Sequence, residues 1–113
     1  MKPTTIYCLK NPLDKNTIFY VGRTIQPLNT RLNGHISANR NIRMMAILQK
    51  IKEAGLKPII EPLEVCTGYF LPSVRERYWI RRINQRKSKL INSIHAKISY
   101  KKMNLYLELA RLK

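Results

Sequence analysis

Two short apolar runs near the start of the chain, each with a tyrosine in its middle, constrain the fold most strongly. They are TTIYCL (residues 4–9) and IFYVG (residues 18–22), and the turn-forming stretch NPLDKN (residues 11–16) separates them. β-branched and aromatic residues favour strands, and a spacer of this composition fits the loop of a hairpin. The sequence therefore predicts a β-hairpin whose second strand ends at a glycine.

The two tyrosines, Tyr7 and Tyr20, are predicted to lie on the same side of this hairpin. Side chains alternate between the two faces of a strand, so Tyr7 shares a face with Leu9, and Tyr20 shares a face with Ile18 and Gly22. If the two faces coincide, both phenol rings project from one surface of the sheet. This prediction depends on an assumed register.

Helical and extended patterns alternate over the rest of the chain. Proline is favoured in the first turn of a helix, and apolar residues recur every four positions after Pro27. Both features predict a helix that begins there. A third strand is predicted over residues 57–66, at an edge of the sheet because it contains two prolines. Further helices are predicted over about residues 41–54, 73–87 and 99–112, the first of these with the apolar stripe Ile42, Met45, Leu48 and Ile51.

Together these elements predict a single α+β domain. Its core, over about residues 4–93, would be a small three-stranded antiparallel sheet flanked by helices. A C-terminal helical extension would follow over about residues 94–113. This extension carries two apolar stripes, which would cap the core or form a homodimer, so the chain is expected to be a monomer or a homodimer.

The charge of the chain points to a polyanionic partner. Lys and Arg number 22 against six Asp and Glu, which gives a net charge of +16 in 113 residues. Nucleic acid is the commonest such partner, and an anionic membrane surface is the alternative. The sequence offers no basic amphipathic helix with a dominant exposed apolar face, and no apolar run of about 18 residues that would span a bilayer. We therefore expect nucleic-acid binding and no membrane association.

The two cysteines, Cys8 and Cys66, lie in separate apolar segments without the spacing of a metal site. They are expected to be small, buried, reduced side chains. The first residues, MKPTTIYCLKNP, contain too short an apolar stretch for a secretory signal. Both observations favour a cytoplasmic protein.

The scarcity of acids limits the chemistry. The six carboxylates are scattered along the chain, at Asp14, Glu53, Glu61, Glu64, Glu76 and Glu108. Two-metal phosphodiesterases bring several carboxylates to one point, which this distribution disfavours. Metal-assisted phosphodiester hydrolysis would instead use one Mg²⁺ held by one carboxylate, waters and the substrate phosphate.

Glu76 has two interpretations. The stretch Ser73-Val74-Arg75-Glu76 matches a capping box, in which the glutamate folds back onto the first backbone amide of a helix. On a helical wheel, however, Glu76 heads an apolar face that contains Ile80, and most of its neighbours are arginines. A carboxylate at the border of the core needs a cation, so Glu76 is also a candidate for a metal or an ion pair.

Arg31 and His35 lie four residues apart on the helix that follows the hairpin, so they share one face. A guanidinium group matches phosphate oxygens and stays charged at all working pH values. A tyrosine is a poor base, since its reference pKa is about 10, but a cationic pocket would pull that pKa toward neutrality. Tyrosine chemistry therefore requires the hairpin to face this helix.

Taken in order, these residues resemble the GIY-YIG nuclease superfamily. Its two tripeptides correspond to Thr5-Ile6-Tyr7 and Tyr20-Val21-Gly22, and its Arg- and His-bearing helix to RLNGH at 31–35. The metal-binding glutamate of the family corresponds to Glu76 in RERYWI, and its final asparagine to Asn92 in LIN. The resemblance covers about residues 4–93. It departs from the family pattern at Thr5, which replaces a glycine, and at Val21, which replaces an isoleucine.

The resemblance implies a DNA endonuclease that leaves 5′-phosphate and 3′-hydroxyl ends. It implies one Mg²⁺ per site, with Mn²⁺ as a substitute, held by Glu76. Tyr7 would activate the attacking water, as a phenolate or through hydrogen bonding, and Tyr20 would orient that water. Arg31 would neutralise charge on the phosphorane, His35 would shuttle a proton or contact phosphate, and Asn92 would brace the site. The basic residues expected to contact nucleic acid are Arg23, Arg40, Arg43, Arg75 and Arg82. A non-catalytic basic nucleic-acid-binding protein is the alternative function.

Overall fold

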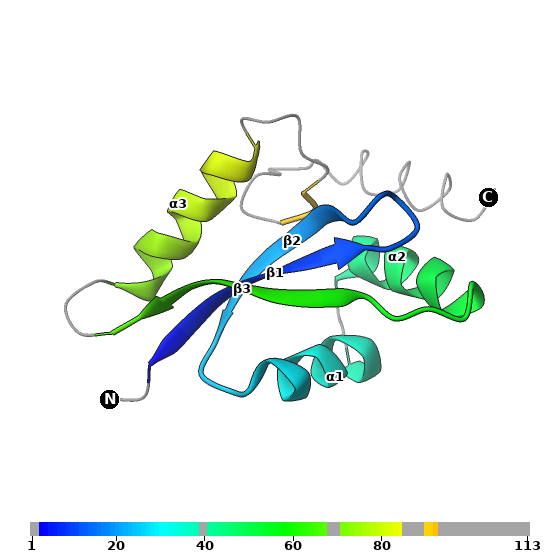
Figure 1. Ribbon diagram of the computed structural model, residues 1–113, viewed down its shortest axis with the longest axis horizontal. Helices are drawn as coiled ribbons and strands as arrows, with labels where there is room; N and C mark the ends of the chain where they lie inside the picture. Colours follow the sequence, from blue (N-terminus) through cyan, green and yellow to red (C-terminus); the bar gives the residue numbers. More distant parts are fainter. Residues whose placement is uncertain (1–2, 39–40, 68–70, 85–89, 93–113) are drawn as a thin grey trace.

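The chain forms an α+β fold built on a three-stranded antiparallel sheet with the order β2-β1-β3 (Figure 1). The computed structural model describes residues 3–38, 41–67, 71–84 and 90–92. The strands are β1 (Thr4–Asn11), β2 (Thr17–Thr24) and β3 (Ile59–Cys66), and the helices are α1 (Leu28–Ala38), α2 (Ile42–Glu53) and α3 (Pro72–Asn84). Over these described residues, none of the helices has the length and apolar character needed to cross a bilayer.

The hairpin of β1 and β2 has the register that brings the two tyrosines together. Tyr7 pairs with Gly22 and Leu9 pairs with Tyr20, so both phenol rings lie on the same face, as predicted. The register shifts after Leu9, and Phe19 is the additional residue in β2. This bulge moves Ile18 to the opposite face, where it packs near Val21. The predicted sharing of a face by Ile18 and Tyr20 is therefore wrong.

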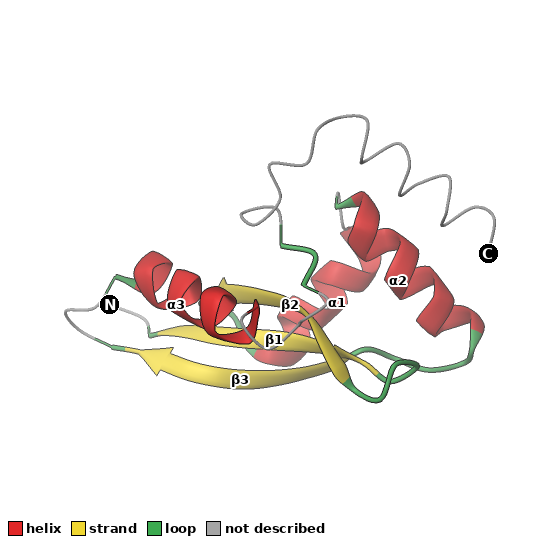
Figure 2. Cartoon of the chain, turned by 90° about the horizontal axis from the view of Figure 1, so that it is seen from above, coloured by secondary structure: helices red, strands yellow, loops and turns green. Residues whose placement is uncertain are grey.

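Two apolar clusters, one on each face of the sheet, hold the helices in place. On one face, Ile6, Cys8, Val21 and Cys66 pack with Ile80 of α3. On the other face, α1 and α2 cover a cluster that contains Tyr7, Leu9, Phe19, Met44 and Ile91. Figures 1 and 2 show this arrangement, with α3 across the sheet from α1. Both cysteines are free and buried, as expected.

The predicted helix over about residues 41–54 and the predicted edge position of the third strand are confirmed. The side chain of Asn41 accepts hydrogen bonds from the backbone N–H groups of Arg43 and Met44 and so caps α2, which Gly55 follows with a φ of +73°. The strand β3 lies at an edge of the sheet, which accommodates its proline at position 62. The predicted apolar stripe of α2 is only partly correct, because Met44 and Ile51 are buried while Ile42 and Met45 are exposed.

The helix α3 begins at Pro72, and this settles one of the two interpretations of Glu76. The backbone N–H groups of Val74 and Arg75 bond to the carbonyl of Leu71, which places Leu71 at the N-cap. Ser73 is therefore inside the helix, and the predicted capping box with Glu76 does not form. The predicted end of this helix near residue 87, the C-terminal helix over 99–112 and Arg40 lie outside the described residues.

Candidate active site

The hydroxyl of Tyr7 is the centre of a hydrogen-bonded cluster between β1 and α1. The Nε2 atom of His35 lies 2.6 Å from this oxygen, and the Nε–H group of Arg31 donates to it at 3.2 Å. Arg31 and His35 reach the same atom because they are one helical turn apart on α1. The side chain of Tyr7 is completely buried and that of His35 nearly so. The predicted encounter of the tyrosine hairpin with the Arg- and His-bearing helix is thus observed.

Gly22 makes room for the Tyr7 ring. A Cβ atom at position 22 would lie 2.5 Å from the Tyr7 hydroxyl oxygen and 2.8 Å from a ring carbon of Tyr20. Both distances are shorter than a Cβ atom tolerates, so only glycine at position 22 leaves room for both phenol rings. This steric role explains why the second tyrosine strand contains a glycine at this position.

Tyr20 lies beside Tyr7 and His35. The ring centroids of Tyr20 and Tyr7 are 6.3 Å apart, and those of Tyr20 and His35 are 5.3 Å apart. Tyr20 is partly exposed, and within the described residues its hydroxyl has no hydrogen-bond partner. This hydroxyl can therefore contact a water molecule or a substrate oxygen.

Burial keeps both Tyr7 and His35 neutral at pH 7. Desolvation raises the pKa of Tyr7 to about 12, more than the hydrogen bond and charge of Arg31 lower it. Desolvation and the nearby Arg31 charge lower the pKa of His35 to about 4. The expectation that a cationic pocket would pull the tyrosine pKa toward neutrality is wrong for this structure, because burial outweighs the single guanidinium group.

With both groups neutral, the hydrogen bond between Tyr7 and His35 can run from the phenol to the imidazole. A neutral phenol has one O–H group, and its oxygen already accepts from Arg31. His35 is neutral, so its Nε2 can carry a lone pair and accept the Tyr7 proton across 2.6 Å. Arg31, Tyr7 and His35 then form a chain that leads from a fixed positive charge to a proton acceptor.

Glu76 reaches the site from α3, which packs on the opposite face of the sheet. Its partly buried carboxylate lies 3.9 Å from Nε of the exposed Arg23 on β2. Desolvation raises the pKa of Glu76, and Arg23 only partly offsets this effect. Its negative charge in turn raises the pKa values of Tyr20 and Tyr7, so the carboxylate and both phenols share one electrostatic environment.

Asn92 braces the backbone between Tyr20 and Gly22. Its Nδ2 donates to the carbonyl of Val21 at 2.6 Å, and its Oδ1 accepts from the N–H of Val21 at 2.9 Å. The N–H of Ile91 also bonds to the carbonyl of Phe19 at 2.9 Å. These contacts pair the free edge of β2 at Phe19 and Val21 and so fix the strand on both sides of Tyr20. Asn92 contacts backbone atoms in this way and does not itself bond to a phenol hydroxyl.

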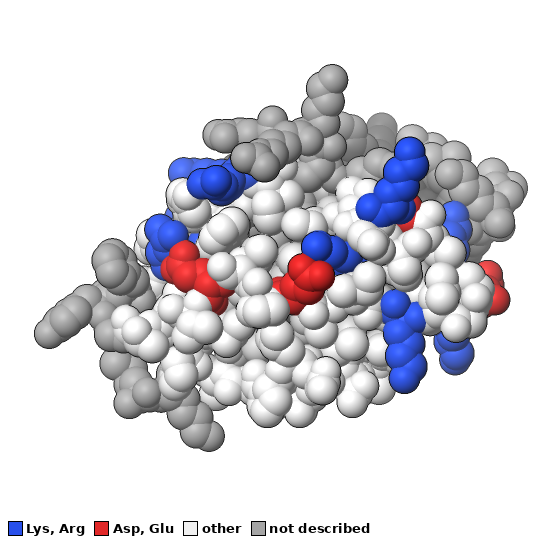
Figure 3. All heavy atoms as spheres, viewed as in Figure 1, with Lys and Arg blue, Asp and Glu red and all other residues white. Residues whose placement is uncertain are grey.

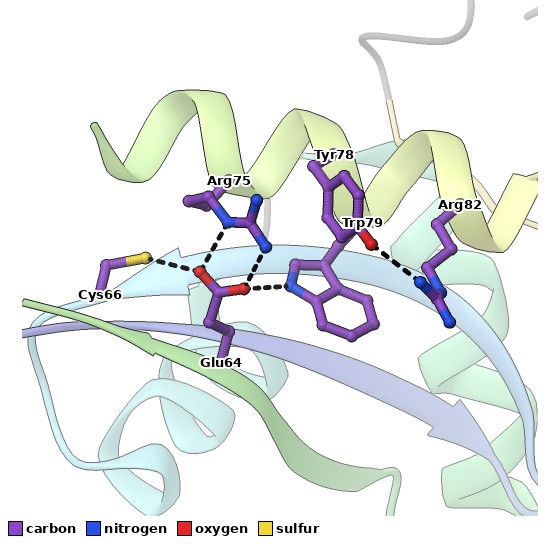
Figure 4. A network of polar contacts seen from close by, with 6 residues as sticks. All are labelled: Glu64, Cys66, Arg75, Tyr78, Trp79 and Arg82. Carbon is purple, nitrogen blue, oxygen red and sulfur yellow. Dashed lines mark hydrogen bonds and ion pairs between the residues drawn. The ribbon is translucent and has the colours of Figure 1, made fainter. Parts of the chain in front are cut away.

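Arg75, one of the predicted nucleic-acid contacts, is held by Glu64 of β3 (Figure 4). Its Nε and Nη2 donate to the two oxygens of Glu64 at 2.7 and 2.6 Å. The indole N–H of Trp79 donates to the same carboxylate at 3.2 Å. These bonds lower the pKa of Glu64 to about 2. Arg75 therefore fastens α3 to the sheet.

The other predicted nucleic-acid contacts have different surroundings. Arg23 is half-exposed beside Glu76, at the rim of the site. Arg82 is exposed, and its Nη1 donates to the hydroxyl of Tyr78 at 2.8 Å. Arg43 is half-buried at the start of α2, away from the β2–α3 side where Arg23 and Glu76 meet. On the face that Figure 3 displays, basic side chains lie over α3 and also at several places on the rest of the surface.

The donor set fits a magnesium ion with few protein ligands. Within the part of the chain that the structure describes, no three His, Cys, Asp or Glu side chains gather into a metal cage. Mg²⁺ retains several waters and commonly takes one or two carboxylates together with substrate phosphate. Glu76 offers one partly buried carboxylate whose ionised form needs a nearby cation.

The structure thus brings Tyr7, Tyr20, Arg31 and His35 into direct contact and adds Glu76 through its charge. Sequence reasoning missed the anchoring role of Glu64, because its pairing with Arg75 depends on how α3 crosses β3 and no local pattern signals it. Comparisons with protein-family models, with curated proteins and with solved structures find no match for this chain. The resemblance to the GIY-YIG superfamily stays a prediction.

Proposed function

We propose that this protein is a metal-dependent endonuclease of the GIY-YIG type that hydrolyses phosphodiester bonds in DNA. The observation that carries the proposal is the Tyr7 hydroxyl, bonded to both His35 and Arg31 and accompanied by Tyr20 and the charge of Glu76. A buried phenol between a proton acceptor and a guanidinium group suits proton transfer beside a phosphate. The net charge of +16 supports a nucleic-acid substrate.

Glu76 would hold one Mg²⁺, for which Mn²⁺ would substitute. When bound, this ion supplies Lewis-acid stabilisation of the negative charge on the phosphate and on the leaving 3′ oxygen. Burial of Glu76 supports this role, because an adjacent cation would compensate for the cost of its ionisation. Arg23 at 3.9 Å is the neighbouring positive charge that the protein itself supplies.

Tyr7 and His35 would remove the proton of the attacking water as a relay. One proton of the water moves to the Tyr7 oxygen while the Tyr7 proton moves across the 2.6 Å hydrogen bond to Nε2 of His35. The water oxygen forms a bond to phosphorus, and the bond from phosphorus to the 3′ oxygen breaks. The leaving 3′ oxygen takes a proton from solvent and becomes the 3′ hydroxyl. Tyr7 stays neutral throughout, which agrees with its pKa of about 12, and His35 becomes an imidazolium that later returns its proton to solvent.

When Arg31 binds the substrate, it would leave the Tyr7 oxygen and make that oxygen accessible to the water. Its Nε–H now occupies an acceptor position of the Tyr7 oxygen, and the Tyr7 side chain is completely buried. A scissile phosphate is a stronger partner for a guanidinium group than a neutral phenol is. Transfer of Arg31 to a phosphate oxygen would free that acceptor position, and Tyr20, with its free hydroxyl, would orient the incoming water.

The proposal is tested by comparing Glu76→Ala with Glu53→Ala in a DNA cleavage assay with Mg²⁺ or with EDTA. Glu53 is an exposed carboxylate at the end of α2, so its variant removes the same charge at a distance from the tyrosines. We expect the wild type and Glu53→Ala to cut in Mg²⁺ and not in EDTA. Glu76→Ala should lose cleavage by at least about 100-fold, with DNA binding retained.

Two outcomes would count against this function. If Glu76→Ala cuts at the normal rate, the metal assignment is wrong. If the wild type binds DNA in both buffers and cuts in neither, the chain is a non-catalytic nucleic-acid-binding protein, which its basic charge alone would also support.

A further inference from the structure

The outer face of α3 carries a groove that faces away from the sheet. It has a volume of about 500 Å³ and is lined by Val74, Arg77, Tyr78, Arg81 and Arg82. These residues recur at intervals of three and four along α3, so they form one stripe. Ile80, which is buried against the sheet, points the other way. The groove is therefore separate from the cluster around Tyr7, although both involve α3.

The ion pair at Glu64 decides which arginines of α3 face this groove. Glu64 holds Arg75 through both of its carboxylate oxygens. Arg77 and Arg81 are exposed, and neither has a carboxylate partner among the described residues. Glu76 is the single acid within α3, and it lies on the side of Ile80. The groove consequently carries positive charge that the described part of the protein leaves unneutralised.

Tyr78 forms an aromatic platform in the groove. Tyr78 is 39% exposed as a residue, and Val74, which also lines the groove, is 56% exposed. The guanidinium group of Arg75 lies 4.3 Å from the ring centroid, and Nη1 of Arg82 donates to the hydroxyl, as Figure 4 shows. Contacts with two arginines hold the ring in place, so little side-chain entropy would be lost when a planar group stacks on it.

We propose that this groove binds an unpaired stretch of a DNA strand. A base would stack on Tyr78 and contact Val74, while Arg77 and Arg81 would contact the flanking phosphates. Exposed aromatic rings bordered by positive charge are how proteins hold single strands, because every base has a face that can stack. The inference rests on the proposed function only for the identity of the polyanion as DNA. It names the substrate class as DNA that contains an unpaired strand.

A duplex would use this groove less well. The phosphates of a duplex can reach Arg77 and Arg81, but its bases are stacked on each other and cannot cover Tyr78. The groove therefore favours a single strand by the stacking on one aromatic ring, which is worth about 5- to 150-fold in affinity.

The test measures binding in EDTA, so that cleavage plays no part. The probes are a fluorescent oligodeoxythymidine and a fluorescent duplex, each titrated with protein over a range of salt concentrations. The variants are Arg77→Gln/Arg81→Gln, Tyr78→Leu and Tyr78→Phe. The control is Lys50→Gln/Lys52→Gln, which removes two exposed charges from α2. Circular dichroism verifies that each variant is folded.

We expect the wild type to bind the single strand more tightly than the duplex. Arg77→Gln/Arg81→Gln should reduce the salt dependence of single-strand binding by about 1.4 in the logarithmic slope, since each lost phosphate contact contributes about 0.7. The control should change this slope by less than half as much. Tyr78→Leu should weaken single-strand binding about tenfold and leave duplex binding unchanged, while Tyr78→Phe keeps the ring and should bind as the wild type does.

The inference is overturned if the two double variants lower the slope equally, or if Tyr78→Leu binds the single strand normally. If Tyr78→Leu does not fold, the comparison of the two double variants decides the outcome. A protein that shows the expected binding but never cuts DNA would contradict the proposed function and leave the groove assignment standing. A protein that cuts duplex DNA but fails these binding tests would contradict the groove assignment and leave the proposed function standing.

Discussion

At the scale of single residues, the burial of Tyr7 determines how the site can work. A phenol with a pKa of about 12 is protonated at pH 7, so it is not itself a base. In the proposed mechanism it passes its proton to the acceptor that it contacts. His35 is that acceptor, because burial and the Arg31 charge keep it neutral over the working pH range. In the proposed mechanism the tyrosine, the histidine and the arginine therefore act together, and none of the three could move the proton alone.

The lowered pKa of His35 predicts a pH dependence of stability. Above pH 6.5 this histidine is neutral in both the folded and the unfolded chain. As the pH falls from 6.5 to about 4, the unfolded chain gains a proton that the folded chain does not, so the free energy of unfolding decreases. The full decrease is on the order of 3 kcal/mol.

This decrease is measured by urea unfolding of the wild type and His35→Gln between pH 7 and pH 4. The other groups titrate alike in both proteins, so the difference between the two unfolding free energies isolates His35. We expect that difference to shift by about 3 kcal/mol in favour of the variant as the pH falls. Parallel curves would show that His35 is not buried as a neutral group.

The positions of the site residues could be predicted from the sequence, but their ionisation could not. Tyr7 and Tyr20 follow from strand alternation, and Arg31 and His35 from helical spacing. The pKa of Tyr7 depends on how completely α1 covers it, which no local pattern specifies. No local pattern specifies the pairing of Arg75 with Glu64 either, since it joins residues eleven positions apart where α3 crosses β3.

At the scale of elements, α3 connects the two halves of the candidate site. One side of this helix packs Ile80 into the core and brings Glu76 to β2. Its contact with β3 is fixed by the Glu64 carboxylate, which accepts from Arg75 and Trp79. The position of Glu76 beside Arg23 of β2 therefore depends on an anchor on the far edge of the sheet.

The anchor predicts a difference between two glutamates of the same strand. Glu64→Gln should destabilise the protein by about 2 kcal/mol, because charge-assisted hydrogen bonds to Arg75 and Trp79 are weakened. Glu61→Gln is the control, since Glu61 forms a more exposed pair with Lys10 at 2.8 Å and should cost less than about 1 kcal/mol. Urea unfolding at pH 7 measures both values. Equal losses would mean that the Glu64 network is no stronger than a surface ion pair.

Elements were predicted well where a local signal marks them and less well where packing decides. Asn41 and Gly55 flank α2, and Pro62 marks β3 as an edge strand. The face of α2 that meets the sheet was partly mistaken, because its apolar residues nearly encircle the helix and only tertiary packing selects Met44 over Met45. The bulge at Phe19 was also missed, since nothing in an apolar run reveals an additional residue.

At the scale of the whole molecule, the two faces of the sheet carry different parts of the candidate site. One face carries the phenols beneath α1, and the other carries α3 with Glu76. The α+β class and the antiparallel sheet could be predicted because a hairpin and alternating elements leave few arrangements. That the charge of Glu76 would reach Tyr20 from the opposite face could be anticipated only through the family resemblance.

The most direct test of the account is the single-turnover rate at which Tyr7→Phe cuts DNA in Mg²⁺, compared with the wild type. This substitution removes one oxygen atom, the one that bonds to His35 and Arg31, and keeps the buried ring. The account predicts a rate at least about 100-fold lower, with unchanged DNA binding in EDTA and a cooperative unfolding transition. Cleavage by Tyr7→Phe at the wild-type rate would contradict it.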